Sequence, residues 1–249
     1  MNKLSAAYKN ELYKLYKKKK VYVAAVLCLL TVAVGAVMSY LINNFMGISV
    51  TTGASFPVVV LPIMMNTLIS LFIIFICVDM FGGEFAANTI KFTLTTPASR
   101  FKIFTAKFLA AATFIAASLA AILLLSLIAS FILGGDMSGL LYAVIAYIVS
   151  VLPLTVFALL VILIANLTRG TTSAFMLSIL AFLVFRGVEF AAPTYSAMLF
   201  TASYDWYTYF AAAGDYINYG KIFRLLLIQG GYFVMLFSLG YMLFEKREI

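Results

Sequence analysis

Five apolar stretches without a charged residue constrain this sequence more than any other feature. They cover residues 21–42, 57–78, 108–133, 139–166 and 225–244. About 20 helical residues, rising about 1.5 Å each, cross the roughly 30 Å hydrocarbon layer of a membrane. Residues 171–192 form a sixth stretch, interrupted by Arg186 and Glu189. Because the stretches do not alternate as barrel strands would, the sequence predicts an all-α polytopic membrane protein with six transmembrane helices.

The composition indicates one membrane domain over residues 1–249 and excludes several kinds of site. Only 10% of the residues are charged, against about 25% in soluble domains. The absence of histidine excludes histidine-based metal sites and Ser–His catalysis, so we expect no catalytic residue, no metal and no cofactor in this chain. Cys28 and Cys77 lie in apolar stretches and are predicted to be buried packing residues without a disulfide.

The distribution of basic residues predicts the topology. Of the 17 lysines and arginines, the N-terminal segment holds seven, the connection between spans two and three holds four, and the C-terminal tail holds two. The positive-inside rule then places both termini in the cytoplasm. The net charge of +8 is explained by this topology and by anionic membrane lipids, so we expect no nucleic-acid partner.

Residues 1–20 are predicted to form an interfacial helix. Apolar side chains recur on one face of the stretch LSAAYKNELYKLY, at Leu4, Tyr8, Leu12 and Leu15, as in basic helices that lie in a membrane surface. Glu11 lies near this apolar face. It can pair with Lys14, three residues further on, or it can reach a partner or a basic residue of 91–107.

The connection after span two reads FGGEFAANTIKFTLTTPASRFKIFTAK, residues 81–107. Gly82 and Gly83 are predicted to end span two, and a short amphipathic helix is predicted from Glu84. Thr96 and Pro97 are predicted to be the N-cap and first position of the next helix. Two interpretations remain open from the residues: a basic loop that happens to be helical, and a docking helix for a soluble partner.

The spacing of residues from Glu84 to Lys107 resembles that of the permease subunits of type-2 ABC exporters, and the layout of the whole chain is similar to theirs. Asn88 departs from the glycine usual before Thr89 in that family. The resemblance implies that 81–100 is a cytoplasmic coupling region seated on a separate ATPase subunit. Residues implied in coupling are Glu84, Phe85, Asn88, Thr89, Lys91, Phe92, Pro97 and Arg100. Glu84 and Arg100 would brace this region, and the interfacial helix, with Glu11, Leu12 and Leu15, would support it.

The resemblance also implies the partners. The chain has no G-x-x-x-x-G-K-[ST] loop, so ATP and Mg²⁺ are expected in the ATPase partner. A second permease copy, identical or different, and membrane lipids are the other expected partners. Residues 193–220 would form two short re-entrant helices that cap the pathway on the outer side.

A few polar residues inside the spans are candidates for a substrate path, namely Asn66, Arg186, Glu189 and Gln229. Structural interpretations compete with this one, because Arg186 and Glu189 can pair on one helix face and neutral polar residues commonly bond between helices. Gly230 and Gly231 are predicted to permit close approach of another helix.

The resemblance implies an ATP-driven exporter in the bacterial cytoplasmic membrane that expels an amphipathic substrate, in the first place a toxin or antimicrobial peptide. Export of hydrophobic drugs or of lipid-linked glycans remains open. A non-transporting immunity or sensor protein is a further alternative. An intramembrane enzyme is disfavoured, because the spans lack histidine and paired aspartates.

Overall fold

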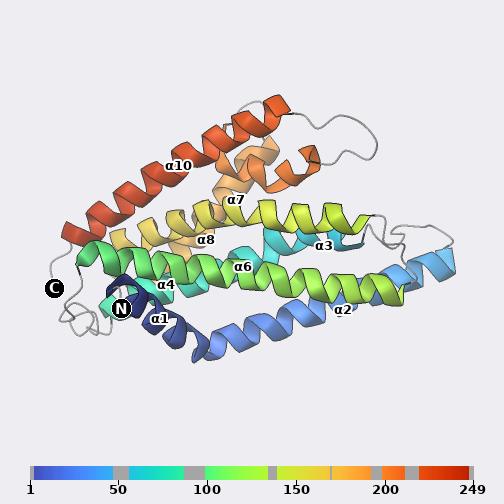
Figure 1. Ribbon diagram of the computed structural model, residues 1–249, viewed down its shortest axis with the longest axis horizontal. Helices are drawn as coiled ribbons and strands as arrows, with labels where there is room; N and C mark the ends of the chain where they lie inside the picture. The colour runs from blue at the N-terminus through green and yellow to red at the C-terminus, as the bar shows by residue number, and fades with distance from the viewer. Residues whose placement is uncertain are drawn as a thin grey trace.

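The computed structural model describes residues 3–46, 56–86, 99–133, 139–168, 170–191, 198–210 and 219–246. All regular structure in these ranges is helical (Figure 1). The elements are α1 (Lys3–Tyr16), α2 (Lys19–Met46), α3 (Phe56–Met64), the π-helix η2 (Met65–Ile69), α4 (Ser70–Ala86), α6 (Arg100–Ile132), α7 (Leu140–Leu167), α8 (Thr171–Ala191), the 3₁₀-helix η4 (Phe200–Tyr209) and α10 (Tyr219–Lys246).

The six predicted spans are confirmed. Within the described residues, six helical segments are long and apolar enough to cross a membrane, the second made of α3, η2 and α4 in series. Most of them extend a few residues beyond the charge-free stretches. Charged residues lie in these extensions, among them Lys20, Lys102 and Lys221, whose long side chains can reach the membrane surface while the backbone stays helical.

The second span contains two features that its sequence explains in part. Pro62 lacks an N–H and therefore cannot make the helical hydrogen bond to the preceding turn. The π-turn of η2 follows directly, and the hydroxyl of Ser70 donates to the carbonyl oxygen of Met65 at 2.5 Å. The predicted end of the span at Gly82 and Gly83 is wrong, because α4 continues through both to Ala86. Glycine is common in transmembrane helices, and burial of the neighbouring Phe81 stabilises the helix there.

The predicted start of the third span at Thr96 and Pro97 is also wrong. Helix α6 begins at Arg100, and Ser99 is its N-cap, with extended backbone (ψ 149°) and a side chain that accepts from the amide of Lys102 at 3.4 Å. Serine serves as well as threonine in this position. The helix therefore starts three residues later than the Thr-Pro signal predicts.

Helix α7 occupies the centre of the bundle, where it contacts α4, α6, α8, α10 and η4 (Figure 1). In its most apolar window 67% of the residues are buried, against 11% to 17% in α2, α8 and α10. Cys28 and Cys77 are buried and unpaired, as predicted. Helix α1, the end of α4, the start of α6 and the end of α10 lie together at one end of the molecule (Figure 1).

Candidate functional site: a buried ion-pair ring at the α1 end

A fully buried lysine lies at the α1 end of the bundle. The Nζ atom of Lys107 is 3.0 Å from Oε2 of Glu11 and 2.8 Å from Oε2 of Glu84, and it donates to the carbonyl oxygen of Met80 at 3.2 Å. The side chain of Lys107 has no exposed surface. Three acceptors thus match the three donors of its ammonium group.

A second lysine completes the arrangement. Nζ of Lys14 is 2.9 Å from Oε1 of Glu11 and 3.0 Å from Oε1 of Glu84. Each carboxylate therefore contacts both ammonium groups, and the four side chains, which we call the ion-pair ring, carry no net charge. Burial lowers the pKa of Lys14, but the hydrogen bonds and charges of Glu11 and Glu84 outweigh it and hold the pKa above its usual value.

The ion-pair ring joins three segments that are far apart in the sequence. Glu11 and Lys14 lie one turn apart on α1, Glu84 lies in the last turn of α4, and Lys107 lies two turns into α6. Glu11 was predicted to pair either with Lys14 or with a basic residue of 91–107. Both contacts are present, because Glu11 contacts Lys14 and Lys107 together. Losing any one member leaves an uncompensated charge, which is costly in a buried site.

Apolar side chains surround the Lys107 side of the ion-pair ring. Leu15 of α1 is buried, and Phe81 and Phe104 are fully buried. The Phe81 ring lies 5.9 Å from Nζ of Lys107 and meets the ring of Phe104 edge to face at 5.7 Å. Phe244 of α10 completes this aromatic cluster, 6.2 Å from Phe81. In such surroundings the electrostatic interactions between the four charges are stronger than at the surface.

Two further contacts tie other helices to the same end. Asp79 of α4 lies 2.9 Å from Nζ of Lys20 at the start of α2. The guanidinium of Arg100 donates to the backbone carbonyl oxygen of Glu245 in α10. The starts of α2 and α6 are thereby attached to α4 and α10.

A second polar group of residues lies at the opposite end, around η4. Arg186 and Glu189 pair on one face of α8 at 2.5 Å, as predicted, and the guanidinium lies 5.7 Å from the ring centre of Tyr204. Gln229 of α10 is fully buried and donates to the carbonyl oxygen of Phe200 at 2.9 Å. Three of the four proposed path residues therefore meet at η4.

The fourth, Asn66, lies apart from them in the π-turn of the second span. Its amide donates to the carbonyl oxygen of Pro62 in the same span at 2.9 Å.

The family of the chain follows from a comparison with known families. Residues 7–187, nearly three quarters of the sequence, match a family model described as ABC-2 family transporter protein. This chain belongs to that family. The matched region contains all four members of the ion-pair ring. No individually curated protein matches the sequence.

Membership in the ABC-2 family makes the chain a multi-pass transmembrane permease subunit of an ABC transporter. The family's permease is the transmembrane part of the transporter and not its ATPase, and it implies an ABC ATPase partner.

Several predicted coupling residues of the permease lie outside the described residues. These are Asn88, Thr89, Lys91, Phe92 and Pro97, and the side chain of Phe85. Within the described part, Glu84 contacts lysines of α1 and α6, whereas Arg100 contacts α10. The two residues therefore brace different neighbours. Leu15 is buried and Leu12 half-buried, so α1 packs against the rest of the permease.

The sequence analysis missed the two lysines of the ion-pair ring as site residues. Lys107 directly precedes a charge-free span, and a lone charge at that position is a signal of a buried partner. Within η4, Tyr204, Trp206 and Tyr207 are buried. Trp206 donates from Nε1 to the carbonyl oxygen of Val149 in α7 at 3.2 Å, which explains its burial.

The close approach predicted at Gly230 and Gly231 is absent within the described residues. No heavy atom outside the neighbouring backbone of α10 lies within 4 Å of a Cβ built at either glycine. The close approach occurs further along α10, at Gly240, where a Cβ would lie 3.2 Å from Cζ of Phe104 in α6.

Proposed function

We propose that this permease serves an ATP-driven exporter of the bacterial cytoplasmic membrane and that residues 84–95 seat in its separate ATPase. The observation that carries the proposal is the ion-pair ring. Residues 87–98 connect α4 to α6, and the ring attaches the helices on both sides of this connection to α1.

The ring would make the two ends of the connection move together with α1. Separating any of the three helices means parting buried opposite charges, which costs several kcal/mol. A displacement applied to 87–98 would therefore reach α4 and α6 as one body, and the Asp79–Lys20 and Arg100–Glu245 contacts would extend it to α2 and α10. Contiguous packed contacts of this kind can carry coupling between sites.

The docking surface itself would come from the connection. Phe85 and Phe92 would supply apolar contacts, and Asn88, Thr89 and Lys91 polar ones, before Pro97 leads into α6. ATP and Mg²⁺ would bind in the ATPase, and a second permease copy would form the other half of the pathway. The basic residues at the α1 end favour a cytoplasmic position for this end.

The proposed cargo is an amphipathic peptide, a toxin or an antimicrobial. This part rests on the resemblance to small peptide-exporting permeases. The polar group around η4, with Arg186, Glu189 and Gln229, would contact the cargo near the other end of the bundle. Hydrophobic drugs and lipid-linked glycans are the alternative cargoes.

Copurification tests the docking proposal. The tagged permease is coexpressed with the ABC ATPase of the same organism, and the retained ATPase is quantified. We expect stoichiometric retention that Phe85→Ala with Phe92→Ala abolishes. Phe190→Ala is the matched control, because this phenylalanine is 93% exposed at the far end of α8. Equal retention by both variants would contradict docking on 84–95.

Resistance assays test the cargo. Cells producing the permease and its ATPase are challenged with amphipathic antimicrobial peptides and with hydrophobic drugs. We expect resistance to peptides that disappears when the ATPase is inactivated. Resistance to drugs alone would identify the alternative cargo, and peptide resistance that persists without ATP hydrolysis would indicate an immunity protein.

A further inference from the structure

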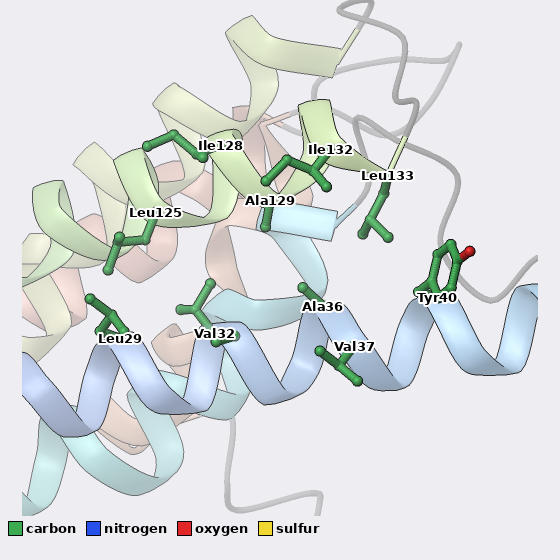
Figure 2. Close-up of a pocket in the computed structure, with 11 residues that line it drawn as sticks. Leu29, Val32, Ala36, Val37, Tyr40, Leu125, Ile128, Ala129, Ile132 and Leu133 are labelled. Atoms are coloured by element: carbon green, nitrogen blue, oxygen red, sulfur yellow. The ribbon is translucent and has the colours of Figure 1, made fainter.

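An apolar groove runs between α2 and α6 at the end of the bundle remote from α1. It has a volume of about 550 Å³. Across it, Leu29, Val32, Ala36 and Tyr40 of α2 face Leu125 and Ala129 of α6 and Leu133 at the C-cap of that helix (Figure 2). Both helices are membrane spans, so the groove lies at the depth of the hydrocarbon layer.

The groove is open sideways and closed at its floor. Val32 and Ala129 at the floor are 3% and 8% exposed, whereas Ile132 at the rim is 80% exposed. Alanines on both walls leave the space that longer side chains would fill. The lining has no charged group and one hydroxyl, that of Tyr40. Water is a poor occupant, because an ordered water needs two to four polar partners.

The dimensions of the groove select among apolar occupants. From Leu29 to Tyr40 the wall is about 16 Å long, which is about half of the roughly 30 Å hydrocarbon layer. The groove thus spans about one leaflet. This length matches that of one acyl chain in a single leaflet, and the lining offers such a chain apolar side chains along nearly its whole length.

We propose that this groove binds one acyl chain of a membrane lipid from the leaflet remote from α1. The chain lies along α2 and α6 with its methyl end near Leu29, and the lipid head group lies beyond Tyr40. A tyrosine at this level suits the boundary between hydrocarbon and head groups. Because the described lining has no cation, the site selects for the acyl chain and not for the head-group charge.

Photo-crosslinking tests the proposal independently of export and of the ATPase. The permease is placed in nanodiscs with phosphatidylcholine that carries a diazirine in the middle of one acyl chain, and labelled residues are mapped by mass spectrometry. We expect groove residues to be labelled more than residues of equal exposure elsewhere on α2 and α6. Phosphatidylglycerol with the same chain should give the same map.

Two pairs of substitutions sharpen the test. Ala36→Phe with Ala129→Phe fills the groove, and Ala25→Phe with Ala117→Phe adds the same rings to exposed positions on the same helices. We expect the first pair to lower groove labelling to the level of equally exposed residues elsewhere on the two helices, because its rings fill the space of the acyl chain. The second pair should leave it unchanged.

Three results would overturn the site. If labelling of the wild type depends only on how exposed each residue is, the groove is not a lipid site. This comparison needs no variant, so it holds even if the filled variant fails to fold. Groove labelling unchanged by a folded filled variant would also contradict it. Efficient crosslinking between Ala36→Cys residues of two permease copies would show that a second copy covers the groove instead.

Discussion

Replacing Lys107 by methionine removes the ammonium group that two buried carboxylates share. Methionine keeps a similar length and an apolar stem, so the change acts mainly on charge. Glu11 and Glu84 would keep only Lys14 as a partner, and the ring would change from no net charge to one negative charge. The side chain of Glu11 is 5% exposed and that of Glu84 16%, so water compensates for little of this charge.

The magnitude follows from the burial. Removing one partner of a buried ion pair costs about 3–5 kcal/mol, and we expect the lower end, because Lys14 remains and is itself 37% exposed. Lys20→Met is the matched control, since its pair with Asp79 is exposed at 49% and 26% and such a pair contributes about 0–1 kcal/mol.

Amide hydrogen exchange of α1 measures the effect as a local opening free energy. About 3 kcal/mol corresponds to exchange on the order of a hundredfold faster after Lys107→Met, against less than about tenfold after Lys20→Met. Adding Glu11→Gln to Lys107→Met returns the ring to no net charge and should restore most of the protection. Equal exchange in the two single variants, or no recovery in the double variant, would refute the argument that buried charge balance holds α1 in place.

Two other predictions follow from single contacts. Glu11 and Glu84 raise the pKa of Lys14 against the opposing effect of burial. The stabilisation from charged Lys14 is therefore complete below its unfolded pKa of 10.5 and is lost as the pH rises through the higher folded value. The difference in thermal stability between wild type and Lys14→Met should be constant at neutral pH and shrink above 10.5, and a difference that grows above that pH would contradict the prediction. Gly240→Leu should destabilise the permease by about 1–3 kcal/mol through overpacking, because a Cβ there already lies 3.2 Å from Cζ of Phe104. Gly230→Leu should cost less, because no heavy atom outside its own stretch of helix backbone lies within 4 Å of a Cβ at that position. Unfolding of both variants is followed by titration with a denaturing detergent, and an equal loss in both would contradict the overpacking.

The spans could be predicted from the sequence because membrane insertion depends on length and apolar composition, which are local properties. The ends of the spans were harder to predict. Gly82 and Gly83 are helix breakers by propensity, but tertiary packing around Phe81 overrides a cost of about 1 kcal/mol each. Similarly, Thr96 and Ser99 are both good N-caps, and nothing local decides between them.

Only part of the ion-pair ring could be predicted from the sequence. The Glu11–Lys14 contact follows from helical spacing on α1. The contacts of α1 with Glu84 and Lys107 join residues 70 and 96 positions apart, and their meeting depends on how α1 folds back against α4 and α6. The sequence showed that Glu11 lies near the apolar face of its helix, without showing that the four charges compensate one another.

The use of four charges at this position calls for a reason other than stability. Apolar side chains of similar volume often stabilise a buried site as well as an ion pair does or better. An apolar contact, however, is non-directional, and α1 could shift along α4 and α6 with little loss of buried area. Four charges that each contact two neighbours are satisfied in one register alone, because a shift of α1 by one helical turn would part Glu11 from Lys107 and Lys14 from Glu84. The ion-pair ring therefore fixes the position of α1 relative to the helices that flank 87–98, which is the property a segment needs if it is to transmit a displacement and not absorb it.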